Sequence, residues 1–168
     1  MILSRSVKRK LLCVKLIVFD FDGVMTNNKV LLSETGEEYA FISRSDGVGI
    51  YLLREAGYKV LFLSSETKPI VAMRANKLHV PVIHGTKEKQ KALIEYTAEN
   101  GVSLEEILYV GNEWNDIECL KIAGVAVIPN DAHSCVKKLA DIKLRSRGGD
   151  GVARELADLL NSVTKRGG

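Results

Sequence analysis

The chain has 168 residues, of which 46% are hydrophobic and 27% are charged, so its composition excludes a disordered protein. The formal net charge is only +3 and no basic stretch is interleaved with aromatic residues, so no nucleic-acid partner is expected. The size and the absence of a linker predict a single domain over residues 1–168, with a core over about 13–162.

The N-terminal part of the chain predicts a solvated terminus followed by a strand. The basic run from Arg5 to Lys10 is expected to be solvated. The apolar segment after it, residues 11–21, is interrupted by Lys15 and ends on Asp20 and Asp22. It therefore predicts a core strand and not a signal peptide or membrane span.

Apolar runs then alternate with segments of helical pattern. Strands are predicted from the runs at 15–21, 58–64, 80–85, 108–112 and 125–129. Helical patterns at 45–57 and 89–101 end on glycine, and Ser103 and Glu106 have the spacing of a capping box. The repetition of strand and helix predicts an α/β fold, a parallel sheet covered on both faces, into which residues 27–44 insert a β-hairpin.

Polar residues follow the apolar runs. In a parallel sheet, ligands bind outside the carboxyl ends of the strands, where strand order reverses. Asp20 and Asp22 follow the first strand and would repel each other unless a cation lies between them. Ser64, Ser65 and Glu66 follow the second strand; Lys87 and Lys89 follow the third; Asn112, Glu113 and Asp116 follow the fourth.

These residue types suit phosphoryl transfer at a magnesium ion. Acidic side chains from the first and fourth strands can hold Mg²⁺, with water and a substrate phosphate completing its coordination. A serine hydroxyl and a lysine ammonium, Ser64 and Lys89, can hold phosphate oxygens. Asp20 can attack phosphorus to form an aspartyl phosphate, and Asp22 can protonate the leaving oxygen and later activate water.

The chain resembles the haloacid dehalogenase superfamily in four motifs. Its first motif, DxDGxxT, appears as residues 20–26, which end on Thr26; the second is Ser64, the third Lys89 and the fourth GNEWND. The resemblance implies a three-layer Rossmann-like fold. It also implies a metal site at Asp20, the backbone carbonyl of Asp22, Asn112 and Glu113, and a role for Thr26 in substrate binding.

Within this superfamily the chain looks like the capless sugar-acid phosphatases. The hairpin, SRSDGVGI and RGGDGVARE carry this resemblance, and LSSETKPIVAMRANKL is most similar to the branch that acts on 2-keto-3-deoxynononate 9-phosphate. It implies that Glu66, Arg74 and Lys77 bind the sugar acid across a subunit boundary in a homotetramer built by the hairpins. The phosphatases of 3-deoxy-octulosonate 8-phosphate are the less favoured branch. RGGDGVARE is interpreted as a glycine-rich turn whose amides close over an anionic ligand.

The fourth motif departs from the usual GDDxxD, because Asn112 stands where a metal-binding Asp is expected. GNExxDxECL also looks like the catalytically silent C-terminal domain of animal CMP-sialic acid synthetases, where this fold serves assembly. A silent assembly module, working beside or detached from a cytidylyltransferase, therefore stays an alternative, although Asp20 is intact. A phosphoacceptor receiver domain is disfavoured, because the third strand ends on HGTKEK and not on Asp.

The cysteines and histidines predict no metal site of their own. The three cysteines are odd in number and lack CxxC spacing, so neither a disulfide framework nor a zinc knuckle is indicated. Buried free thiols in a reducing cytosol fit better, which predicts a cytoplasmic protein. The three histidines lack close ligand spacing as well.

Overall fold

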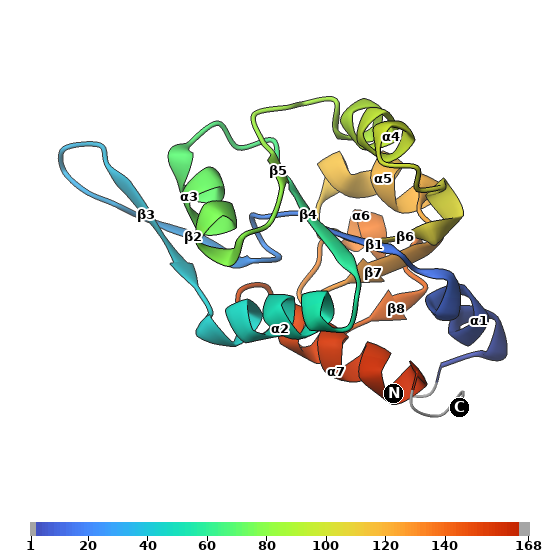
Figure 1. Ribbon diagram of the computed structural model, residues 1–168. Helices are drawn as coiled ribbons and strands as arrows, with labels where there is room; N and C mark the ends of the chain where they lie inside the picture. The colour runs from blue at the N-terminus through green and yellow to red at the C-terminus, as the bar shows by residue number, and fades with distance from the viewer. Residues whose placement is uncertain (1–2, 165–168) are drawn as a thin grey trace.

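A six-stranded parallel sheet forms the centre of the molecule. The computed structural model describes residues 3–164, and its helices lie above and below the sheet (Figure 1). The strand order is β5-β4-β1-β6-β7-β8. The strands are β1 (Leu16–Phe19), β4 (Lys59–Leu63), β5 (Val82–Ile83), β6 (Ile107–Val110), β7 (Val125–Ile128) and β8 (Ile142–Lys143). The predicted α/β fold with a parallel sheet is confirmed. The predicted single domain over residues 1–168 includes residues 1–2 and 165–168, which lie outside the described part.

Helices cover both faces because alternate strand residues point to opposite sides. Ile17 and Phe19 of β1 join the core under one set of helices, while Leu16 and Val18 join the core under the other. The first set is α1 (Arg5–Cys13), α2 (Arg44–Glu55), α3 (Pro69–Leu78) and α7 (Val152–Thr164). The second set is α4 (Lys89–Glu99), α5 (Ile117–Ile122) and α6 (Ser134–Lys137).

The basic run at the N-terminus is exposed to solvent, as expected, but it is helical. The basic run lies in helix α1, which Ser4 caps by accepting a hydrogen bond from the Val7 amide at 3.2 Å. Leu11 buries its side chain against the core, at 2% exposure, and Lys10 pairs with Asp141 at 3.2 Å. Leu11, the partly buried Val7 and one ion pair therefore fix the basic helix. The predicted strand is correspondingly shorter and begins at Leu16.

The other predicted elements are found within a few residues of their expected bounds. Helix α2 ends shortly before Gly57, and α4 shortly before Gly101; both glycines have positive φ, +89° and +62°. The capping box is present at the 3₁₀ helix η1 (Leu104–Glu106), where the Ser103 amide donates to Glu106 at 3.0 Å. A second 3₁₀ helix, η2 (Trp114–Asp116), follows β6.

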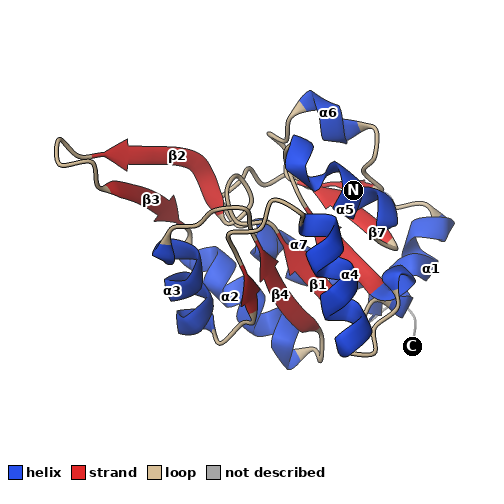
Figure 2. Cartoon of the chain, turned by 90° about the horizontal axis from the view of Figure 1, so that it is seen from above, coloured by secondary structure: helices blue, strands red, loops and turns tan. Residues whose placement is uncertain are grey.

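The inserted hairpin stands apart from the main sheet. Strands β2 (Thr26–Leu32) and β3 (Glu38–Ile42) pair only with each other in an antiparallel ribbon. Figure 2 shows this ribbon projecting from the body of the molecule. It exposes apolar side chains, among them Leu31 at 60%, Leu32 at 62% and Phe41 at 67%. Residues 20–43, between β1 and α2, hold this hairpin and no cap domain.

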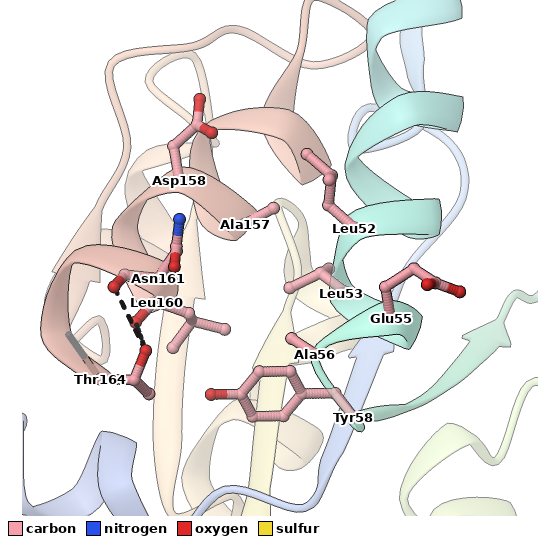
Figure 3. Close-up of a pocket in the computed structure, with 10 residues that line it drawn as sticks. All are labelled: Leu52, Leu53, Glu55, Ala56, Tyr58, Ala157, Asp158, Leu160, Asn161 and Thr164. Atoms are coloured by element: carbon pink, nitrogen blue, oxygen red, sulfur yellow. Dashed lines mark hydrogen bonds between the residues drawn. The ribbon is translucent and has the colours of Figure 1, made fainter.

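Helices α2 and α7 cross closely below the sheet. A Cβ on Gly49 would lie 2.3 Å from the backbone of Ala153, so only glycine permits this approach. Further along the pair, a groove of about 390 Å³ opens between Leu52, Tyr58 and Leu160 (Figure 3). Because Tyr58 directly precedes β4, this groove lies at the amino ends of the strands, opposite the edge that Asp20 occupies.

No helix among residues 3–164 has the length and apolar character needed to cross a membrane.

Candidate active site

A small polar cleft lies where the strand order reverses. The chain runs from β1 outward to β4 and β5, and then returns to β6 on the other side of β1. Such a reversal leaves a crevice at the carboxyl edge of the sheet. The cleft encloses about 150 Å³. It is lined by Asp20, Asp22, Asn28, Ser64, Ser65, Asn112, Glu113 and Asn115. Six polar residues that the sequence places at strand ends are therefore brought together here: Asp20, Asp22, Ser64, Ser65, Asn112 and Glu113.

A buried lysine lies between two carboxylates at the floor of the cleft. Lys89, in the first turn of α4, is 2% exposed, and its Nζ lies 2.6 Å from Asp20 Oδ1 and 2.9 Å from Asp116 Oδ1. Burial opposes the charged form of Lys89, but the two carboxylates outweigh it and raise the pKa of Lys89. The ammonium therefore stays charged and fixes Asp20 in place.

Asp116 is held by donors from α4, from β6 and from its own loop. Its Oδ1 accepts the Tyr109 hydroxyl at 2.7 Å, and its Oδ2 accepts the amides of Asn112 at 2.8 Å and Glu113 at 3.1 Å. A Cβ on Gly111 would come within 2.6 Å of Asp116, so the loop needs glycine there. Sequence reasoning missed Tyr109, because a tyrosine inside an apolar strand gives no sign of a polar partner.

The Asn112 side chain reaches the same point as Asp20 and the Asp22 carbonyl. The end of its amide that faces them lies 2.9 Å from Asp22 O and 3.2 Å from Asp20 Oδ2. With the amide nitrogen at this end, Asn112 donates to both oxygens. With its oxygen there, three oxygens converge and no proton lies between them.

This arrangement of oxygens fits a magnesium ion. Octahedral Mg²⁺ with bonds of about 2.0–2.1 Å places adjacent ligand oxygens about 2.9 Å apart. The two separations at Asn112 are close to that value.

Burial and the Asp116 charge also raise the pKa of Asp20 to about 8, although Lys89 acts to lower it. Positive charge beside Asp20 would favour its ionised form.

Asp22 lies nearer to solvent than Asp20, and its pKa is also raised. Burial and the nearby Glu66 raise the pKa of Asp22, against a hydrogen bond from the Thr26 hydroxyl at 3.4 Å. Thr26 Oγ1 also accepts the amides of Gly23 at 3.1 Å and Asn28 at 3.3 Å, so this buried side chain organises the turn. A carboxyl with a raised pKa suits a general acid.

Glu66 stabilises the loop between β4 and α3. Ser64 Oγ accepts the Glu66 amide at 3.1 Å. The Glu66 carboxylate accepts the amides of Thr67 at 2.7 Å and Lys68 at 2.9 Å. This carboxylate caps the turn before α3 and does not hold Arg74.

Arg74 and Lys77 do not line the cleft of this single chain. Arg74 is 9% exposed, its Nη2 donates to the Ser43 carbonyl at 3.0 Å, and its buried Nε makes no hydrogen bond with any described residue. Lys77, three residues later, is exposed. The two side chains are neighbours on α3, but the hairpin base and α2 cover Arg74 while Lys77 stays in solvent.

Acidic side chains of the same chain accept hydrogen bonds from the amides of the glycine-rich turn before α7. Buried Asp46 accepts the amides of Gly151 at 3.2 Å and Ala153 at 2.7 Å, while Glu155 accepts those of Arg145 and Ser146. Asp46 thus occupies the Gly151 and Ala153 amides at the start of α7, which leaves the interpretation that this turn closes over an anionic ligand without support.

The Glu113 carboxylate points to the rim of the cleft. Its Oε1 accepts the Trp114 amide at 2.9 Å and lies 3.5 Å from His133 Nδ1. Glu113 is predicted from the sequence to bind the same metal ion as Asp20. No contact in the described part of the structure supports that role.

Comparison with known sequences gives the family. Residues 58–156 match the model of haloacid dehalogenase-like hydrolases. The chain is 30% identical over 155 residues to the 3-deoxy-D-manno-octulosonate 8-phosphate phosphatase of Haemophilus influenzae, covering 92% of this chain and 86% of that protein. This chain belongs to the haloacid dehalogenase-like hydrolases. The family assigned from the four motifs is confirmed.

Two further comparisons refine this placement. The chain is 29% identical over 157 residues to N-acylneuraminate cytidylyltransferase A of Danio rerio, covering 91% of this chain but only 36% of that protein. It thus spans about a third of that relative. Among solved structures, the cobalt-bound octulosonate 8-phosphate phosphatase of Haemophilus influenzae superposes with a TM-score of 0.88 at 29% identity, covering 93% of this chain and 92% of that one.

Replacing Lys89 by Met is expected to destabilise the fold. The change leaves Asp20 and Asp116 as uncompensated buried carboxylates, which should cost about 3–5 kcal/mol of unfolding free energy. Urea denaturation of Lys89→Met with a chelator present measures this, and Lys87→Met, at an exposed position two residues earlier, is the control. Equal midpoints for the two variants would contradict the structural role of Lys89.

Proposed function

We propose that this chain is a metal-dependent phosphatase of 3-deoxy-2-keto sugar acids, with 3-deoxy-D-manno-octulosonate 8-phosphate as its leading substrate. The observation that carries the proposal is the buried contact of Lys89 with Asp20, at the point where Asp22 O and Asn112 converge. Family membership and a phosphatase relative matched over 86% of its length support the reaction type.

Asp20 is the proposed nucleophile. A carboxylate oxygen of Asp20 attacks phosphorus, the bond from phosphorus to the sugar oxygen breaks, and an aspartyl phosphate forms. Lys89 holds Asp20 in position, and its charge offsets that of the phosphoryl oxygens. The Ser64 hydroxyl, at the carboxyl end of β4, donates to one of those oxygens. Mg²⁺ held by Asp20, the Asp22 carbonyl and Asn112 would supply the remaining positive charge.

Asp22 is the proposed acid and base. Its raised pKa favours the protonated form, which can give its proton to the departing sugar oxygen. The resulting carboxylate then takes a proton from the water that attacks the aspartyl phosphate, which releases phosphate and restores Asp20. Thr26 orients Asp22 through its hydroxyl and keeps the turn in the geometry that both roles need.

The eight-carbon substrate now takes precedence over the nine-carbon one that the sequence pattern favours. The compared phosphatase relative is named for octulosonate 8-phosphate, as is the cobalt-bound structure. The nine-carbon 2-keto-3-deoxynononate 9-phosphate stays the second candidate, because the chain also resembles part of an enzyme of acylneuraminates. Glu66, Arg74 and Lys77 are proposed to contact the sugar acid only once a second subunit adjoins the cleft.

A phosphate-release assay with both sugar-acid phosphates tests this proposal. Wild-type protein with Mg²⁺ should release phosphate faster from the eight-carbon than from the nine-carbon substrate. A chelator or Asp20→Asn should abolish release, because each removes a group needed at phosphorus. Asp150→Asn, at an exposed acid outside the cleft, is the control.

The same assay decides between phosphatase and assembly module. Equal, negligible rates for wild type and Asp20→Asn would overturn the phosphatase and favour the silent module beside a cytidylyltransferase. A faster nine-carbon reaction would reverse the substrate order and leave the chemistry intact.

Asn112→Asp should lower the Mg²⁺ concentration needed for half-maximal activity. The change adds one negative charge next to Asp20 Oδ2 and the Asp22 carbonyl, where the ion is expected. A Mg²⁺ titration of the rate measures it. Asn115→Asp is the control, since it adds the same charge at an amide that donates to Ser65. An unchanged curve would mean that Asn112 is not a metal ligand.

The hairpin is proposed to build a homotetramer. A two-stranded ribbon with exposed apolar side chains is unstable alone and buries them well only against another surface. Leu31→Glu with Phe41→Glu should therefore give a smaller species in sedimentation. Thr35→Glu, at the exposed turn, should not. A wild-type monomer would contradict this assembly.

A further inference from the structure

Three side chains with different donor atoms meet on the rim of the cleft, beyond the contact between Lys89 and Asp20. Glu113 belongs to the turn after β6, and His133 and Cys135 come from the start of α6. His133 Nδ1 lies 3.1 Å from Cys135 Sγ and 3.5 Å from Glu113 Oε1, and Cys135 Sγ lies 3.8 Å from the same oxygen. All three ligand atoms thus lie within 4.8 Å of one another.

These separations are close to those around a tetrahedral zinc ion. Bonds of about 2.3 Å to sulfur, about 2.0–2.1 Å to nitrogen and about 2.0–2.2 Å to oxygen place the ligand atoms about 3.4–3.6 Å apart. The observed distances of 3.1, 3.5 and 3.8 Å differ from this range by at most a few tenths of an ångström. Small rotations of the side chains would make up the difference.

The backbone already holds the two loops together. The His133 amide donates to the Asn112 carbonyl at 2.9 Å, so the segment before α6 is tied to the turn that carries Glu113. His133 keeps 57% of its side chain exposed and Glu113 keeps 37%, which leaves the point between them open to an ion and to water from solvent.

The ligand types separate this group from the proposed magnesium site. Magnesium prefers oxygen ligands alone, whereas a thiolate, an imidazole and a carboxylate select a softer divalent ion. The Glu113 carboxylate makes its contacts with this group and not with Asp20, so the two sets share no ligand.

We propose that Glu113, His133 and Cys135 form a second cation site, for a borderline-soft divalent ion such as Zn²⁺, with water as the fourth ligand. On binding, the Cys135 thiol loses its proton to solvent and its sulfur bonds to the ion. His133 uses Nδ1 and Glu113 uses Oε1. The ion then replaces the hydrogen bond between His133 and Cys135 and links the turn after β6 to α6.

Cobalt binding to the 168-residue chain, with Mg²⁺ in excess, tests the site. A cysteine ligand gives Co²⁺ a thiolate-to-metal charge-transfer band in the near ultraviolet, which oxygen ligands do not give. We expect this band in the wild type, with one ion bound per chain. Cys135→Ser should abolish the band. The affinity of His133→Gln for Zn²⁺, measured by competition with a chromophoric chelator, should be more than about tenfold lower than that of the wild type.

Cys13→Ser is the matched control, because Cys13 is also an exposed free cysteine but lies at the end of α1. It should keep both the band and the Zn²⁺ affinity. Circular dichroism melting checks that the variants fold. The proposal is overturned if the wild type shows no band, if Cys135→Ser keeps it, if Cys13→Ser loses it, or if His133→Gln binds Zn²⁺ as well as wild type does.

Discussion

The burial of one ammonium between two carboxylates governs the carboxyl edge of this sheet. Two unit charges of like sign at 4 Å repel by about 4 kcal/mol at an effective dielectric of about 20, so Asp20 and Asp116 need the cation between them. Lys89 supplies it from the start of α4, and Tyr109 and the amides after Gly111 saturate the remaining oxygens of Asp116. The strand β6, its loop and α4 are thereby fixed relative to β1.

Much of this frame can be predicted from sequence, because it depends on local patterns. Apolar runs predict five of the strands, and the two β-prone segments within residues 27–44 predict the hairpin. The rule that ligands bind at the carboxyl ends of parallel strands predicts Asp20, Asp22, Ser64 and Asn112 in the cleft. The strand β8 is not predicted because charged residues alternate with Ile142 and Leu144 in DIKLR, so no continuous apolar run marks it as one marks β5. Helix α1 was missed because its apolar anchor, Leu11, was assigned to the following strand.

Contacts between distant segments could not be predicted in the same way. Asp46 occupies the N-terminus of α7 from more than one hundred residues away, and Arg74 turns to the Ser43 carbonyl at the hairpin base. The spacing of a motif indicates which residues lie in the same helix or strand. It does not indicate which other helix or strand packs against them. The same reason applies to His133, Cys135 and Glu113, whose spacing in the chain resembles no metal motif. The expectation of buried thiols holds only for Cys119, since Cys13 and Cys135 are exposed.

Asn112 decides how the cleft behaves with and without an ion. An amide can present its oxygen to a cation or, after rotation, its nitrogen to Asp20 Oδ2 and the Asp22 carbonyl, so these acceptors are satisfied in both states. An aspartate at 112 would bind the ion more strongly but would add a repelling charge beside Asp20 whenever the ion leaves. If Asn112 is the metal ligand proposed above, the neutral residue would lower metal affinity and raise the stability of the metal-free fold. Because the Asp20 to Lys89 contact does not involve Asn112, the asparagine would weaken the proposed metal site without removing the proposed nucleophile.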